Sequence, residues 1–266
     1  MENRPVAHEV VAQNLSRASE NRIHDDETAR RFGFTGGLVP GVEVHAYACH
    51  AAVRRWGRAW LERGWAETRF LQPVYDGRVA TVEATEAGEK LSLEVRSEGA
   101  LCATGESGLS PPAALPDLRD WPEPPAPPAT RPPAGDASLA PGLLLGTAPW
   151  RPSAADLAEY LRGVSETDPI YAREGLAHPG QVLRLCNRAL VENVVLGPWI
   201  HVGSRVRNFA AARVRQEFNL RARVLSNTER KGHRLVELDA LVSADGGAPV
   251  ARVRHHAIWR LRGGAA

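Results

Sequence analysis

The chain has 266 residues, of which 43% are hydrophobic and 24% charged, and its formal net charge is +2. This length and composition describe a soluble globular protein with enough core material for one large or two ordinary domains. A net charge so close to zero gives no electrostatic case for nucleic acid as a partner.

The three cysteines, Cys49, Cys102 and Cys186, are odd in number and follow no metal-ligand spacing. This usage fits a reducing compartment in which each thiol is a small buried apolar group. The first residues lack the apolar core of a signal peptide, and no apolar run is long enough to span a bilayer. We therefore expect a cytoplasmic protein with no membrane partner and no metal.

Residues 19–50 form the stretch around which we expect the chain to be organised. A polar cluster, Glu20 to Asp26 with Asn21 and His24, precedes a short helical run, which Asp25 or Asp26 is suited to cap. The loop at 36–41, Gly-Gly-Leu-Val-Pro-Gly, then opens onto an apolar helix. Glycines let a ligand approach the backbone closely, and the first N–H groups of a helix have no partner within it. A histidine beside such a helix start predicts proton transfer next to an oxyanion-stabilising site.

A family resemblance rests on a few residues of this stretch, namely Asn21-Arg22-Ile23-His24, Ala29, Gly33-Phe34 and Pro40-Gly41. The pattern resembles the MaoC-like dehydratases, which include the (R)-specific enoyl-CoA hydratases. Their motif is Asp-x-Asn-Pro-x-His followed by a glycine-opened central helix. The resemblance implies a hotdog fold, in which an antiparallel sheet wraps a long helix, and acyl-thioester substrates. Here the position of the family aspartate is Ser19 and that of the proline is Arg22.

The resemblance also implies a role for each matched residue. His24 is the acid/base, Asn21 is its hydrogen-bonding partner, and the Gly41 N–H polarises the thioester carbonyl while water adds across the double bond of a 2-enoyl thioester. Two residues are candidates for the place of the missing carboxylate. Ser19 can hydrogen-bond water or the histidine, whereas Glu20, its neighbour, points to the opposite face if the backbone is a regular strand.

The remainder of the first half reads as a helix followed by a meander of strands. Apolar residues keep helical spacing from Val42, and we expect the helix to continue through residues 54–65, with its tryptophans as core or interface anchors. Strands are predicted near residues 79–84, 91–95 and 101–104, separated by glycine turns. Residues 110–141 hold about half of the chain's 20 prolines and are predicted to be an extended linker without a core.

Residues 142–266 repeat the order of the first half. Glu166, Asp168 and Tyr171 fall where Ser19, Asn21 and His24 stand, and Ala177-His178-Pro179-Gly180 matches residues 38–41 ahead of a second apolar helix. Strands are predicted near residues 202–209, 218–225, 233–242 and 250–261. Because the histidine is replaced by tyrosine, we expect a non-catalytic half that completes the pocket, with a carboxylate-driven second site as the alternative. His201, His255 and His256 read as ordinary strand residues.

The predicted fold is α+β, a double hotdog with units at residues 1–109 and 142–266 joined by the linker 110–141. Substrate contacts are expected at Val39, Pro40, Gly41, Cys49 and Gly180. The predicted function is an acyl-thioester hydratase or dehydratase acting on 2-enoyl or 3-hydroxyacyl thioesters of CoA or of an acyl carrier protein. No cofactor is expected beyond the CoA of the substrate, and two such chains could pair as a homodimer.

Two alternatives to hydration stay open at this point. One is a hotdog thioesterase or another acyl-CoA lyase, in which Glu20, Glu166 or Asp168 activates water toward the carbonyl carbon. The other is a non-catalytic acyl-thioester binder, which the loss of the family aspartate supports.

Overall fold

The computed structural model describes residues 6–112 and 114–263. The first half contributes five strands: β1 (Val6–Val11), β2 (Gly64–Phe70), β3 (Val79–Ala87), β4 (Lys90–Ser97) and β5 (Ala100–Leu109). The second half contributes β6 (Leu144–Gly146), β7 (Ile200–Asn208), β8 (Phe218–Arg230), β9 (His233–Ala244) and β10 (Ala248–Arg260). The helices are η1 (Arg22–His24), α1 (Asp26–Arg31), α2 (Gly41–Trp56), α3 (Arg58–Arg63), η2 (Leu118–Asp120), α4 (Ala154–Gly163), α5 (Ile170–Glu174) and α6 (Pro179–Val191).

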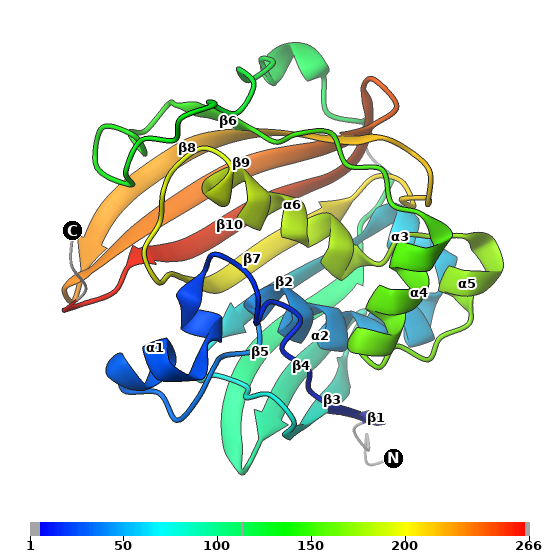
Figure 1. Ribbon diagram of the computed structural model, residues 1–266. Helices are drawn as coiled ribbons and strands as arrows, with labels where there is room; N and C mark the ends of the chain where they lie inside the picture. Colours follow the sequence, from blue (N-terminus) through cyan, green and yellow to red (C-terminus); the bar gives the residue numbers. More distant parts are fainter. Residues whose placement is uncertain (1–5, 113, 264–266) are drawn as a thin grey trace.

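All ten strands belong to one sheet in the order β1-β3-β4-β5-β2-β7-β10-β9-β8-β6, and the sheet curves around α2 and α6 (Figure 1). The halves meet where β2 pairs antiparallel with β7, in a register that runs from Trp65 opposite Arg207 to Arg69 opposite Gly203. This pairing removes the exposed strand edge that each half would otherwise present to solvent. The two units therefore share a continuous sheet, with one central helix each.

The helix α2 is buried on all of its faces, from Val42 through Val53. Its small residues, chiefly alanines, let the sheet and α6 approach it closely. The charged residue of its first turn, Glu43, is fully buried, and its carboxylate accepts a 2.6 Å hydrogen bond from Nε of Arg184 on α6. A buried carboxylate needs such a partner, so this ion pair fixes how the two central helices lie against each other.

The expectation that the first central helix continues to Trp65 is wrong. α2 ends at Trp56 because Gly57 takes a φ of +55°, a left-handed value that glycine adopts without strain. The short helix α3 follows, and Trp65 lies in β2 instead. Trp60 is the anchor that was expected, since it is 1% exposed and donates from Nε1 to the Ser107 hydroxyl at 2.9 Å.

The described residues of the proline-rich segment 110–141 pack largely on the second half. The Trp121 carbonyl accepts a 2.7 Å hydrogen bond from Arg221, Pro133 forms a bridge with Val195, and Leu139 is fully buried in the core around α6. The proposed unit boundaries stay a prediction, since a shared sheet joins both halves.

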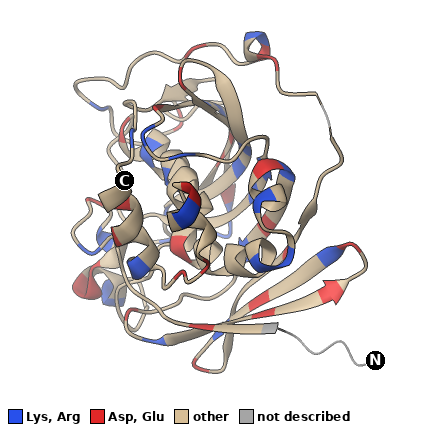
Figure 2. Cartoon of the chain, turned by 90° about the vertical axis from the view of Figure 1, so that its right-hand side faces the viewer, with Lys and Arg blue, Asp and Glu red and all other residues tan. Residues whose placement is uncertain are grey.

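No helix among the described residues is long and apolar enough to cross a membrane. Acidic and basic positions are interspersed on the helices and strands of the side of the molecule that Figure 2 shows. Charge on this side is therefore balanced locally, as the net charge of +2 would suggest.

Candidate functional site

Short capped turns place His24 beside the start of α2. Asn21 caps η1, and Asp25 caps α1 by accepting a 3.0 Å hydrogen bond from Thr28 N, so of the two aspartates suited to cap this helix it is Asp25 that does so. The loop between α1 and α2 then folds back over η1. A side chain at Gly37 would meet the His24 carbonyl oxygen at 2.3 Å, so only glycine allows this approach.

Backbone groups on both sides fix the amide of Asn21. Its Oδ1 accepts from Trp199 N at 3.1 Å, and its Nδ2 donates to the Trp199 carbonyl at 2.9 Å. Nδ2 also lies 3.2 Å from His24 Nε2. The orientation of this amide is therefore determined by groups with only one possible role, and an N–H of Asn21 faces the imidazole.

The tautomer of His24 follows from the same contacts. Nδ1 lies 2.7 Å from the Leu38 carbonyl oxygen, which can only accept, so Nδ1 carries the proton and Nε2 carries the lone pair. Burial lowers the pKa of His24 below its usual range, and the hydrogen bond to the Leu38 carbonyl only partly offsets this effect. His24 is thus a neutral ring at pH 7, with an unprotonated nitrogen that can take up a proton.

The first turn of α2 opens onto the same space. Among the described residues, no acceptor takes the N–H groups of Gly41 and Val42, whereas Glu43 N and Val44 N both reach the Pro40 carbonyl. A methyl group at Gly41 would lie 2.9 Å from both His201 Nδ1 and the Phe70 ring. Glycine is therefore required where the strands close over the helix start, and the free amides beside it can polarise a carbonyl oxygen.

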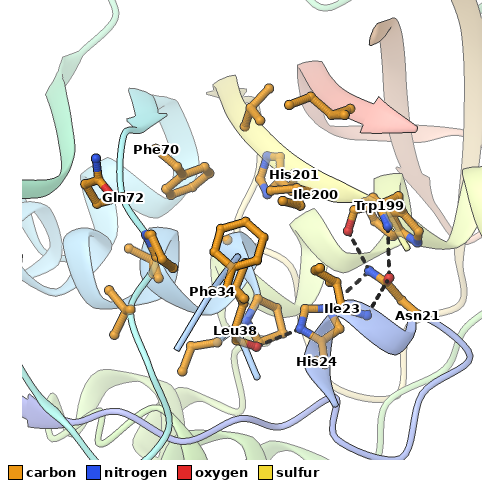
Figure 3. Close-up of a pocket in the computed structure, with 18 of the residues that line it drawn as sticks. Asn21, Ile23, His24, Phe34, Leu38, Phe70, Gln72, Trp199, Ile200 and His201 are labelled. Atoms are coloured by element: carbon orange, nitrogen blue, oxygen red, sulfur yellow. Dashed lines mark hydrogen bonds between the residues drawn. The ribbon is translucent and has the colours of Figure 1, made fainter. Parts of the chain in front are cut away.

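His24 and this helix start line one cavity of about 340 Å³, which we call the apolar cavity (Figure 3). Val39, Pro40 and Gly41 line it as expected, together with Phe34, Phe70 and Ile200. None of its described lining residues carries a carboxylate. The cavity is suited to an apolar chain whose polar end meets His24 and the helix start.

A second hollow of about 730 Å³, the polar cleft, lies on the other side of His24. Both spaces are lined by Asn21, His24, Asn187 and Trp199, so they meet at the imidazole. Ser19 and Glu20 line the polar cleft and not the apolar cavity. The Glu20 side chain is 73% exposed and binds Arg131 at 2.9 Å, so it faces solvent instead of the cavity.

Three buried polar atoms around this junction have no hydrogen-bond partner among the described residues: Ser19 Oγ, Asn187 Oδ1 and Trp199 Nε1. Buried donors and acceptors are nearly always satisfied in folded proteins, by water or a ligand where protein atoms do not serve. The set supplies one donor, one acceptor and one group that can act as either. The junction therefore offers hydrogen-bond partners to a water molecule or to a polar group of a ligand.

His201 is the site residue that sequence reasoning missed. It opens β7, it is 5% exposed, and it lines the apolar cavity together with Phe70, which meets its ring edge-on at 4.8 Å. Its Nε2 contacts the Gly203 carbonyl at 3.1 Å and the Ser204 hydroxyl at 2.8 Å, while Nδ1 has no partner. No local pattern in the chain points to His201, because only the pairing of β2 with β7 brings the second half over the start of α2.

The corresponding helix start of the second half is closed. Gly180 N donates to His178 Nδ1 at 3.1 Å, and a methyl group at Gly180 would meet the Tyr160 hydroxyl at 2.1 Å. Glu166, with a side chain 2% exposed, accepts 2.7 Å hydrogen bonds from His50 Nδ1 and from Asp168 N. Gly180 and Glu166 therefore serve the packing of the two halves, and neither reaches the apolar cavity.

Cys49 also lies away from the apolar cavity. It is 2% exposed in a core cluster with Trp60 and Tyr171, and burial raises the pKa of its thiol. Within residues 6–112 and 114–263, no group of three or more His, Cys, Asp or Glu side chains could hold a metal ion.

No protein-family model and no curated protein matches the sequence. Solved structures do match. A protein from Chloroflexus aurantiacus, described as a MaoC domain dehydratase, aligns with a TM-score of 0.65 at 10% identity over 97% of this chain and 95% of its own. A Mycobacterium tuberculosis protein, described as having a double hotdog fold, aligns with a TM-score of 0.63 at 15% identity over 96% of each chain. An oleoyl thioesterase from Lactobacillus plantarum aligns with a TM-score of 0.53 at 12% identity over 97% of each chain. The predicted double hotdog fold is confirmed.

Proposed function

We propose that this chain hydrates 2-enoyl thioesters, or in reverse dehydrates 3-hydroxyacyl thioesters, at the junction of His24 and the first turn of α2. The observation that carries the proposal is a neutral imidazole, whose unprotonated Nε2 meets only the long contact from Asn21, beside the unpaired Gly41 N–H in the lining of one cavity. The MaoC domain description of a structure with this fold agrees with the proposal. Acyl-CoA or an acyl carrier protein thioester is the proposed substrate.

In the proposed reaction the thioester carbonyl accepts a hydrogen bond from Gly41 N–H. Water attacks Cβ of the enoyl group, a C–O bond forms, and one water proton passes to Nε2 of His24. The pair of electrons from the double bond becomes an enolate, whose oxygen the helix amides stabilise. His24 then returns the proton to Cα, so the ring ends as it began.

Asn21 has a positioning role in this scheme. Its contact with Nε2 is 3.2 Å, at the long end for a hydrogen bond, so an incoming water can share or replace it. The Trp199 backbone holds the Asn21 amide so that its N–H points at Nε2 of His24. A proton on Nε2 would face this N–H, and two donors that face each other repel, so the imidazolium form is disfavoured. The ring therefore holds the proton only during the reaction.

The carboxylate-driven alternatives gain less support from the geometry. Glu20 is exposed and paired with Arg131, and Glu166 is enclosed by His50 and His178. Asp168 accepts a 3.0 Å hydrogen bond from Ile170 N in the turn before α5. None of the three lines the apolar cavity, so a thioesterase at this site would also have to use His24.

The test is steady-state hydration of crotonyl-CoA and of longer enoyl-CoAs by the wild type and by His24→Ala. We expect the substitution to lower kcat by about 10²- to 10⁴-fold, the usual contribution of a general acid/base. His256→Ala, at a half-exposed strand position, is the matched histidine control. Release of free thiol from saturated acyl-CoA would instead indicate a thioesterase, and thermal stabilisation by acyl-CoA without turnover would indicate a binder.

A further inference from the structure

The outer face of the shared sheet carries a groove of about 800 Å³ across β2, β7, β10, β9 and the end of β8, which we call the arginine groove. It is lined by six arginines and only two glutamates: Arg69, Arg205, Arg207, Arg230, Arg252, Arg254, Glu67 and Glu237. The whole chain has a net charge of +2, so this face is far more basic than the rest of the molecule.

Strand register concentrates these charges. Arg205 lies directly opposite Arg254, and Arg207 directly opposite Arg252, on the antiparallel pair β7 and β10. Like charges directly opposite each other destabilise a sheet. The intervening residues Ser204, Val206 and Val253 are buried on the other face, so alternation sends all four guanidinium groups outward.

Acidic neighbours neutralise only part of this charge. Arg205 pairs with Glu67 at 2.8 Å, Asp239 pairs with both Arg252 and Arg254, and Glu237 also pairs with Arg254 at 3.4 Å. No described carboxylate pairs with the three remaining arginines of the groove, which are Arg69, Arg207 and Arg230. Arg69 and Arg230 are exposed at the two ends of the groove, and Arg207 lies over the Phe209 ring between them, so the groove keeps positive charge available to an anionic surface.

The arginine groove adjoins the apolar cavity. Val202 on β7 lines both spaces. The residue before it, His201, lines the cavity, and the residue after it, Gly203, lines the groove. A molecule held in the groove therefore lies beside the cavity where the proposed hydration takes place.

The width of the groove identifies the kind of partner. Arg69 on β2 and Arg230 on β8 are separated by four strand spacings of about 4.8 Å, or roughly 19 Å. The phosphates of a single nucleotide cluster within a much smaller span, whereas a row of carboxylates on a protein covers such a distance. We propose that the arginine groove docks an acidic carrier protein that presents the acyl thioester to the apolar cavity. Delivery of substrate rests on the proposed function, but docking itself does not.

The experiment measures binding and turnover separately, with a purified acidic bacterial acyl carrier protein in its holo form and loaded with crotonate. Arg69→Glu/Arg207→Glu/Arg230→Glu should weaken carrier binding about tenfold or more, and added salt should weaken binding to the wild type. The ratio of kcat/KM for crotonyl-carrier to that for crotonyl-CoA should fall by a similar factor. The control Arg54→Glu/Arg162→Glu/Arg213→Glu changes net charge equally at exposed positions elsewhere and should alter binding by no more than about twofold.

Three results would overturn the docking proposal. The wild type does not bind the carrier, both triple variants weaken binding equally, or the KM for crotonyl-CoA rises as much as that for crotonyl-carrier, which would make the groove a nucleotide site. Arg69→Glu/Arg230→Glu, which leaves the half-buried Arg207 in place, repeats the test should the triple variant fold poorly. Carrier binding without turnover of either thioester would refute the proposed function and retain the docking site.

Discussion

At the scale of single residues, Ser19 has the clearest chemical consequence, because it stands where the motif that the sequence resembles has an aspartate. Ser19 Oγ is buried, has no partner and lines the polar cleft that meets the apolar cavity at His24. We predict that Ser19→Asp raises kcat for crotonyl-CoA hydration about tenfold, because a carboxylate there stabilises the imidazolium that forms as water attacks. The pKa of His24 should rise with it, which moves the acid limb of the pH–rate profile to higher pH.

Ser16→Asp provides the comparison, because Ser16 lines the same cleft without occupying the motif position. It should leave kcat within about twofold, since a charge on an open cleft is screened by water. Slower hydration by a folded Ser19→Asp variant would contradict this prediction and show that a carboxylate at this position does not assist the reaction.

At the scale of elements, the contacts of Glu166 at the start of α6 connect the two central helices. Burial alone would raise the pKa of Glu166, but the hydrogen bonds from His178 and His50 outweigh it and hold the pKa of this carboxyl well below its usual range. His50 comes from α2 and His178 from the cap of α6, so one carboxylate links both central helices. Glu166→Gln should therefore lower the free energy of unfolding by about 1.5 to 3 kcal/mol, the range expected for hydrogen bonds to a charged group.

Urea unfolding of Glu166→Gln against Glu106→Gln measures this effect. Glu106 pairs with Lys90 at the surface, with a side chain 56% exposed, and its substitution should cost less than about 1 kcal/mol. Folded Glu166→Gln should keep its kcat on crotonyl-CoA. A large loss of turnover with normal stability would instead place the second half in the chemistry.

The elements also show where sequence patterns suffice. Turn glycines and apolar periodicity predicted both central helices and the long strands, because these signals act locally. The break at Gly57 was missed since the apolar spacing continues across it, and β1 was missed because its residues gain their partners only by pairing with β3. The motif residues His24 and Gly41 were found from the chain alone. His201, Trp199 and Asn187 join them only through the pairing of the two halves.

At the scale of the whole molecule, folding encloses a set of neutral histidines. His45 is 1% exposed and His255 is fully buried. Burial, reinforced by the nearby His178, lowers the pKa of His45 to about 4. Burial, with His256 and His45 adding to it, lowers the pKa of His255 to about 3. His201 is shifted in the same direction by burial and by its stacked neighbour His255. These rings remain neutral in the fold at pH values where an unfolded chain would protonate them.

The consequence for stability follows from proton linkage. The pKa values of these histidines are lower in the folded state than in the unfolded state. Their full contribution is therefore present above pH 6.5 and is lost as the pH falls toward the folded values. Each of these rings should lower the free energy of unfolding by about 1.4 kcal/mol for each pH unit below 6.5. The urea concentration at the unfolding midpoint should therefore fall steeply as the pH is lowered from about 7 to 5, a range that lies above the titration of most carboxylates.

His255→Asn measures how much of this pH dependence of stability comes from the single proton of His255. The variant loses the stacked ring but keeps an oxygen that can accept from the Ser204 hydroxyl, which lies 3.1 Å from His255 Nδ1. Its unfolding free energy should depend on pH less steeply than that of the wild type, by about 1.4 kcal/mol per pH unit below pH 6. An unchanged slope would mean that His255 takes up a proton in the folded protein, which would require water to reach the space between β7 and β10.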